Sequence, residues 1–156
     1  MNKDIKEFLK QSNFIESEYS SEALEDSLKS WDYMIGKDNL TMDRILEGHG
    51  VLMKNLNSRI AGRFRNCKVW VGGRECPADY AVQELLANWV KLYGRASTKE
   101  DIKKAHVAFE HIHPFEDGNG RIGRIIMNWQ RIKNNLPILI IHEGYEQRNY
   151  YLWFRD

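Results

Sequence analysis

The segment from His113 to Arg124 holds the densest group of residues that could carry out chemistry. Glycines at positions 118 and 120 allow successive backbone N–H groups to converge on one anion. The pattern predicts a helix that starts near Arg121, and the positive end of its dipole would act at the same place. Arg121 and Arg124 are three positions apart, so they share one face and can bind the oxygens of one polyphosphate. The spacing therefore predicts a site for the phosphate chain of a nucleotide.

Two further side chains of the segment add reactive groups to this predicted anion site. Asp117 is a hard oxygen donor, which suits Mg²⁺ that bridges two phosphates better than a metal cage built by protein alone. His113 precedes Pro114, which limits how far the preceding helix can run. Its imidazole titrates near neutral pH and can accept a proton. The segment therefore predicts a general base beside a bound phosphate.

Two other interpretations fit parts of the same segment. The three glycines at 118, 120 and 123 have the spacing of a dinucleotide-binding loop, with Glu143 about twenty residues further on. That loop must follow an apolar strand, whereas residues 109–112 have the pattern of a helix end, so an oxidoreductase is disfavoured. A metal site built from histidines is weaker still, because steps of five and two residues do not share a helical face. Those histidines are His106, His111 and His113.

The elements that must position these residues are mainly helices, because apolar residues recur at helical spacing along most of the chain. Five helices are predicted. The first ends at Gly36, the second runs from the Thr41 cap to residue 60, and the third starts at Pro77. The fourth opens with a capping box at 97–100, and the fifth extends from Arg121 to about Lys133. Residues 63–73 alternate apolar with polar and end in two glycines, which predicts a small β-hairpin. An isolated hairpin is marginal in water, so its edge is either covered or open to an incoming strand. Residues 136–141 fit either a strand or a buried segment.

The composition places the chain among ordinary globular domains. With 156 residues, 42% hydrophobic and 29% charged, we expect one domain over residues 1–156 and no long disordered segment. A net charge of +1 provides no global field to attract nucleic acid or an anionic membrane, so neither is an expected partner. No apolar run is long enough to span a bilayer, and the charged start is unlike a signal peptide. With only two cysteines, we expect a cytoplasmic location.

The twelve residues HPFEDGNGRIGR resemble the Fic-domain signature, HxFx(D/E)GNGRxxR, at every fixed position. Looser similarity covers residues 105–112 and 127–141, and the predicted hairpin lies where this family has its flap. The resemblance implies a compact all-α domain with a small β-hairpin flap. It also implies a protein adenylyltransferase, which moves AMP from ATP to a Ser, Thr or Tyr hydroxyl of a target protein. The protein itself is one candidate target, and a homo-oligomer stays open.

The resemblance also implies a role for each matched residue. His113 would be the general base and Phe115 would fix the loop, while Asp117 would hold Mg²⁺, or alternatively Mn²⁺, on the phosphates. Nucleotide-binding residues would be Gly118, Asn119, Gly120, Arg121 and Arg124, with the arginines at the β/γ end. The flap would hold an extended target segment as an added strand, through Lys68, Val69, Trp70 and Val71.

A second match lies near the start of the chain, in residues 12–17. They resemble the family's inhibitory helix motif, (S/T)xxxE(G/N), through Ser12 and Glu16, and Ser17 departs from its last position. The resemblance implies that the N-terminal segment, about residues 1–20, pairs Glu16 with Arg124 and blocks the γ-phosphate. The competing interpretation is a solvated acidic helix face, since more glutamates follow at 18, 22 and 25.

Other functions stay open at this point. The same site could transfer another nucleotide or phospho-group, or remove AMP by hydrolysis with Glu16 orienting the water. A non-catalytic module that binds a nucleotide or a partner protein is a different class of function. A small helical nucleic-acid binder has poor support from the neutral overall charge.

Overall fold

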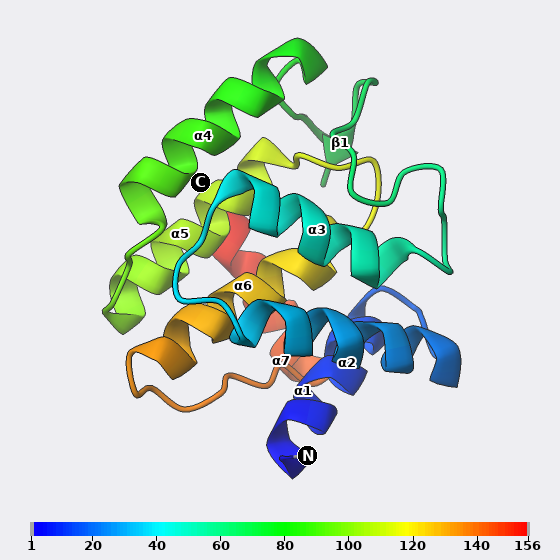
Figure 1. Cartoon of the computed structure of the whole chain (residues 1–156), viewed down its shortest axis with the longest axis vertical. Coiled ribbons are helices and arrows are strands. Elements are labelled where there is room, and N and C mark those ends of the chain that lie inside the picture. Colours follow the sequence, from blue (N-terminus) through cyan, green and yellow to red (C-terminus); the bar gives the residue numbers. More distant parts are fainter. Residues whose placement is uncertain (1, 156) are drawn as a thin grey trace.

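The computed structural model describes residues 2–155, and helices dominate them (Figure 1). The α-helices are α1 (Lys3–Ile15), α2 (Ser21–Ile35), α3 (Met42–Met53), α4 (Val82–Tyr93), α5 (Lys99–Ile112), α6 (Asn119–Lys133) and α7 (Tyr145–Tyr151). Two 3₁₀ turns, η1 (Asp79–Ala81) and η2 (Leu152–Phe154), and the strands β1 (Trp70–Val71) and β2 (Arg74–Glu75) complete the elements. The prediction of an all-α fold with a small β-hairpin is confirmed.

Helix α6 is the centre of the fold. Every residue from 121 to 130 is buried, so this part of the helix is enclosed on all faces. Helices α1, α2, α3 and α5 pack against it, and Figure 1 shows it in the middle of them. The main apolar core includes Trp31, Phe109 and Trp129, and a smaller cluster joins Ile15 to Tyr150 near the end of the chain. The start of α6 is therefore held rigidly at the place where the motif loop enters.

Three helix boundaries differ from the predicted ones. Helix α3 is capped by Thr41 as expected but ends at Met53 rather than at residue 60, and turns follow it as far as Gly62. The Gly62 N–H donates to Nδ1 of His49, and Gly62 has a φ of +70°. Helix α4 starts after a 3₁₀ turn rather than at Pro77, and the cap of α5 is Thr98 rather than Ser97. Thr98 accepts a hydrogen bond from the N–H of Asp101 at 3.1 Å.

The hairpin is shorter than the predicted span of 63–73 and extends beyond it, since its second strand is Arg74–Glu75. Only residues 70–71 and 74–75 pair, and the turn between them uses two glycines with φ of 57° and 81°, as two-residue hairpin loops require. The residues before it do not form a strand, because Arg65 is bonded elsewhere. Its N–H donates to the carbonyl of Pro114 at 3.0 Å, and its guanidinium binds four backbone carbonyls. The hairpin is thereby attached to the loop that follows α5.

Residues 136–141 do not form a strand. They form the alternative that the sequence allowed, a buried segment, although only part of it is buried. The amide of Asn128 takes the place of a strand partner, since it donates to the carbonyl of Leu139 at 3.0 Å and accepts its N–H at 2.9 Å. Ile141 is buried at the end of this segment. The chain then enters α7, which brings Tyr150 against α6. Among the described residues, no helix has both the length and the apolar character needed to cross a bilayer.

Candidate active site

A cavity of about 1260 Å³ opens between the hairpin, the loop that joins α5 to α6, and α7. Most of the residues singled out from the sequence line it: Glu16, Val71, His113, Asp117, Gly118, Asn119, Gly120 and Arg124. Ser12, Lys68, Val69, Trp70 and Arg121 were also singled out but do not form its walls. The fold thus gathers the loop residues and the N-terminal glutamate around one space.

His113 ends α5 in a left-handed conformation, with φ of 51° and ψ of 64°. This conformation folds the imidazole back over the last turn of α5, with Nδ1 at 3.2 Å from the carbonyl oxygen of Glu110. If Nδ1 carries the proton and donates to that carbonyl, Nε2 is left free to accept a proton. Burial lowers the pKa of His113, although the bond to Glu110 opposes the shift. A neutral imidazole at neutral pH is the form that a general base needs.

The loop after His113 is closed by Asn119 and Phe115. The Asn119 amide accepts the Phe115 N–H at 2.9 Å and donates to the Phe115 carbonyl at 2.8 Å. Phe115 is fully buried and stacks on His49 with a centroid distance of 3.7 Å. His49 contacts the Asp117 carbonyl through Nε2 at 2.8 Å. The side chain of Asn119 is therefore occupied in shaping the loop, which leaves only its backbone to contact a phosphate.

We expect His49 to make the folded state sensitive to acid. Burial lowers its pKa from 6.5 to about 4, so between these values the unfolded chain binds a proton that the folded chain does not. The free energy of unfolding should therefore fall as pH falls, by about 2 kcal/mol between pH 7 and pH 5 from this residue. Urea unfolding of the wild type and of His49→Gln at both pH values measures it, and the variant should lose less. The exposed His142→Gln serves as control, and equal losses in all three chains would contradict the prediction.

The first turn of α6 provides an anion-binding end. Helix α6 begins at Asn119, and the first N–H groups of a helix have no partners within the helix. Gly118 precedes it with φ of 84°, and a Cβ there would lie 2.9 Å from the sulfur of Met53. The Gly118 N–H itself donates to Oδ1 of Asp117 at 2.8 Å. The remaining N–H groups and the helix dipole can therefore act on an anion in the cavity.

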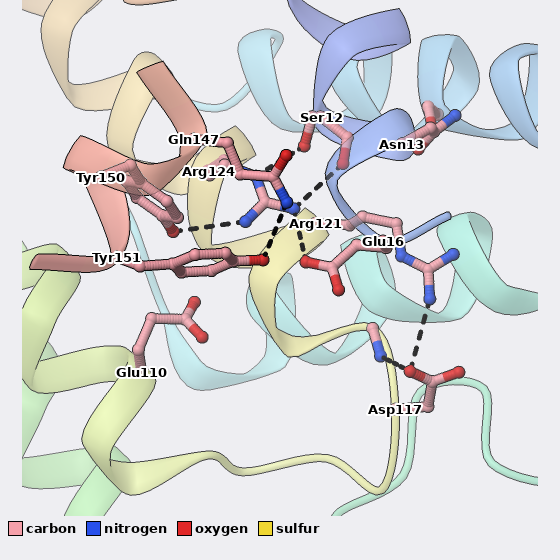
Figure 2. Close-up of polar contacts among 12 residues, drawn as sticks. Ser12, Asn13, Glu16, Glu110, Asp117, Arg121, Arg124, Gln147, Tyr150 and Tyr151 are labelled. Atoms are coloured by element: carbon pink, nitrogen blue, oxygen red, sulfur yellow. Dashed lines mark hydrogen bonds and ion pairs between the residues drawn. The ribbon is translucent and has the colours of Figure 1, made fainter. Parts of the chain in front are cut away.

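The two arginines of the segment do not converge as predicted. Nη2 of Arg121 lies 3.4 Å from Oδ1 of Asp117, and Arg121 is not part of the cavity wall. Arg124 instead extends toward the N-terminal segment and α7, as Figure 2 shows. A spacing of three residues places Arg121 and Arg124 on one face of the helix. Their side chains are long, however, and they bind partners that lie in different directions. Of these two arginines, only Arg124 lines the cavity.

Arg124 is 2% exposed and is held by three residues far from it in sequence. Its Nε donates to Oγ of Ser12 at 2.8 Å, Nη1 donates to the hydroxyl of Tyr150 at 3.2 Å, and Nη2 lies 2.7 Å from Oε1 of Glu16 (Figure 2). Burial alone would lower the pKa of Arg124, but Tyr150 and Glu16 outweigh burial and raise it. The guanidinium is therefore a permanent charge. A Cβ on Gly120 would collide with both Oε1 of Glu16 and the guanidinium, so glycine leaves room for this contact.

Several residues of the site had not been singled out from the sequence. Arg65 donates to the carbonyl of His113 at 2.6 Å and to that of Pro77 at 2.6 Å, which ties the hairpin to the loop. The hydroxyl of Tyr150 lies 2.6 Å from Nε2 of His106, and this contact holds the hydroxyl beside Arg124. Glu110 lines the cavity one helical turn before His113. Only Glu110 had a sequence signal, namely its spacing of three from the histidine.

Comparison with known proteins gives a family for this arrangement. Residues 39–130, more than half of the chain, match the model of the Fic/DOC family. The chain belongs to the Fic/DOC family. This confirms the resemblance seen in the sequence motif.

Curated relatives and solved structures agree with this assignment. The chain is 33% identical over 127 residues to "Protein adenylyltransferase Fic" of Drosophila yakuba, which covers 78% of this chain and 25% of that protein. It is 31% identical over 119 residues to the protein of that name in Aedes aegypti, and the match covers 72% of this chain and 24% of that protein. The chain thus spans about a quarter of the length of these Fic relatives.

Two solved structures share the fold. Fic-1 from C. elegans has a TM-score of 0.78 at 22% identity, covering 98% of this chain and 55% of that one. A Fic domain containing signaling protein from Bacteroides thetaiotaomicron has a TM-score of 0.80 at 21% identity, covering 96% and 70%. These Fic-domain structures confirm the architecture of helices with a small hairpin.

Proposed function

We propose that this Fic-family chain is a protein adenylyltransferase, which moves AMP from ATP to a hydroxyl side chain of a target protein. The observation that carries the proposal is the position of His113, which lines the same cavity as Arg124 and the first turn of α6. The names of its curated relatives support the same activity. In this proposal the cavity holds the nucleotide and the hairpin side receives the target.

The residues divide the reaction between them. Nε2 of His113 would take the proton of the target hydroxyl as its oxygen attacks the α-phosphorus in line. The new P–O bond joins AMP to the target, the bond to the β-phosphate oxygen breaks, and pyrophosphate leaves. The N–H groups at the start of α6 and the guanidinium of Arg124 would stabilise the phosphate oxygens as charge shifts to the leaving group. Positioning and fixed charge would supply most of the acceleration.

The donors present fit a magnesium ion bound mainly through the nucleotide. Among residues 2–155 no three His, Cys, Asp or Glu side chains form a group that could hold a metal, but the Asp117 carboxylate is 67% exposed and lines the cavity. One or two carboxylates together with substrate phosphates are the usual ligands of Mg²⁺. Asp117 would hold the ion, and the ion would neutralise charge on the phosphates.

The hairpin is proposed to receive the target. Val71 lines the cavity, and Trp70 beside it is 60% exposed. Lys68 pairs with Glu75 at 3.6 Å, and the carbonyl of Val69 accepts the N–H of Cys76 at 3.0 Å. An extended segment added along this edge would bring a Ser, Thr or Tyr hydroxyl toward His113.

Glu16 is proposed to restrain the enzyme. Its carboxylate occupies Nη2 of Arg124, the nitrogen that an incoming phosphate would need. A charge-assisted hydrogen bond to a buried guanidinium competes directly with a triphosphate for the same donor. The chain as it stands would then be held in a low-activity form.

The proposed activity is tested on the chain that carries Glu16→Gly. This variant is incubated with Mg²⁺ and with ATP labelled at the α-phosphate, alone and with a mixed protein extract. Intact mass spectrometry should show the variant gaining one AMP, or labelled protein should appear in the extract. Absence of label and of an AMP mass gain would contradict the activity, and a mass gain of one phosphate group instead would indicate a different transfer.

A further inference from the structure

Glu110 is a buried acid of the cavity to which the proposed mechanism gives no part. It lies in the last turn of α5, its side chain is 10% exposed, and it forms part of the cavity wall. Within the described part of the chain, Oε1 of Glu110 has no hydrogen-bond partner. Figure 2 likewise draws no polar contact to its carboxyl group. A buried polar group without a partner is costly, so its retention requires an explanation.

The second carboxyl oxygen points to the partner. Oε2 of Glu110 lies 4.0 Å from Nδ1 of His113. The same Nδ1 is 3.2 Å from the backbone carbonyl of Glu110, because the left-handed conformation of His113 folds the ring over this residue. A small rotation of the glutamate side chain would bring its carboxylate within hydrogen-bond distance. Both acceptors for Nδ1 thus come from one residue.

Helix α6 leaves space for the carboxyl group. A Cβ on Gly123 would collide with Oε1 of Glu110 and would also lie 3.2 Å from Cε1 of His106. Glycine in the interior of a helix is unfavourable for helix stability. Its presence opposite Glu110 leaves room for the carboxyl group between α5 and α6.

The charges around Glu110 couple it to the contact between Glu16 and Arg124. Burial raises the pKa of Glu110 to about 8, Arg124 lowers it and Glu16 raises it. Other titratable groups near it are Tyr150 on α7, Cys76 after β2, and His106 and His113 on either side of it in sequence. With Glu16 in place the carboxyl group is therefore protonated at neutral pH. Departure of Glu16 removes a negative neighbour and frees Arg124, and both changes favour the carboxylate.

We propose that Glu110 is a positioning residue for His113: its carboxylate accepts the Nδ1 proton and holds Nε2 toward the target hydroxyl. Once Nε2 has taken the hydroxyl proton, the ring is an imidazolium, and Glu110 provides its counter-charge. The proton later passes from Nε2 to solvent, which returns the ring to its starting form. This inference rests on the proposed adenylyl transfer. It also gives Glu16 a second effect: besides occupying Arg124, Glu16 would act on His113 through the protonation of Glu110.

The kinetic test compares Glu110→Gln with Glu110→Asp, both in the chain that carries Glu16→Gly. The amide keeps the shape but cannot carry the charge, so kcat should fall by about 10–100-fold with little change in the KM for ATP. The acidic limb of the pH profile should also move to lower pH, because the base loses a neighbouring negative charge. Asp should restore part of both effects. Glu100→Gln, an exposed change of the same charge on the same helix, should alter neither.

A second measurement does not depend on activity. NMR titration of the His113 ring should give a lower pKa in Glu110→Gln than in its parent, and thermal unfolding reports whether each variant is folded. An unchanged kcat and an unchanged His113 titration would overturn the proposal. So would a raised KM for ATP with an unchanged titration, because that result would place the effect on Arg124. If the parent chain transfers no AMP, the proposed function fails, and the titration alone then decides whether Glu110 acts on His113.

Discussion

The substitution His113→Ala, made in the chain that carries Glu16→Gly, should lower AMP transfer by about 10²–10⁴-fold. The expected loss is large because His113 is the side chain proposed to take the hydroxyl proton. Among residues 2–155 the imidazole bonds to the backbone of Glu110 and makes no hydrogen bond to the first turn of α6, so the phosphate site should survive. Single-turnover transfer from labelled ATP measures the loss, and equilibrium ATP binding should stay within a few-fold of the parent.

A matched control for this change is available on the same wall of the cavity. His111 also lines the cavity, but its ring packs against Phe154 with a centroid distance of 6.4 Å. His111→Ala should therefore keep most of the transfer rate. Transfer that survives His113→Ala within a few-fold would remove the base assignment. A parallel loss of ATP binding would show instead that the loop had changed shape.

The loop from His113 to Arg124 could be predicted because its geometry is decided locally. A proline after the histidine, glycines at 118 and 120 and a helix start are contiguous, so their types and order restrict the backbone without help from distant residues. The observed loop closes on itself through Asn119 and Phe115, four positions apart. Contiguity is also why a short motif was enough to indicate the family.

The partners of the loop could not be predicted from spacing, because they come from distant parts of the chain. Ser12 is 112 positions from Arg124, and Tyr150 is 26 positions from it on the other side. Spacing on α6 predicted that Arg121 and Arg124 would act together, yet each found a partner of its own. The contact of Glu16 with Arg124 was expected only through the family motif, since an acidic helix face would have given the same local sequence.

The extent of the hairpin also could not be predicted from the local sequence, because it depends on contacts with distant residues. Alternation over residues 63–73 predicted strands, but Arg65 is withdrawn from any ladder by its bonds to four carbonyls. A buried arginine in a segment of alternating pattern cannot be told from an exposed one by periodicity. The outcome depends on whether carbonyls from elsewhere reach it. The two glycines, which adopt positive φ, form the turn itself, whereas the pattern had placed them at the end of the hairpin.

The change Glu16→Gly should raise AMP transfer over the wild type by about 10–100-fold, which corresponds to the usual worth of one hydrogen bond to a charged group. The carboxylate lies 2.7 Å from Nη2 of Arg124, but it is 36% exposed and follows the end of α1, so it can be removed without opening the core. Ser12 and Tyr150 would still hold the guanidinium in place for a phosphate. Transfer at subsaturating ATP and equilibrium ATP affinity are both measured, because competition for one donor predicts that the two rise together.

Two further variants separate this competition from a general effect of charge. Glu16→Gln keeps the length and one hydrogen-bond acceptor but loses the charge, so its rate should fall between those of the wild type and Glu16→Gly. Glu18→Gln removes a negative charge two residues away, where the side chain accepts a hydrogen bond from Ser20, and should leave transfer unchanged. An equal rise in Glu18→Gln would mean that the acidic surface as a whole repels ATP. Equal transfer by the wild type and Glu16→Gly would mean that the contact with Arg124 is structural, because a phosphate would then reach the guanidinium with the carboxylate still in place.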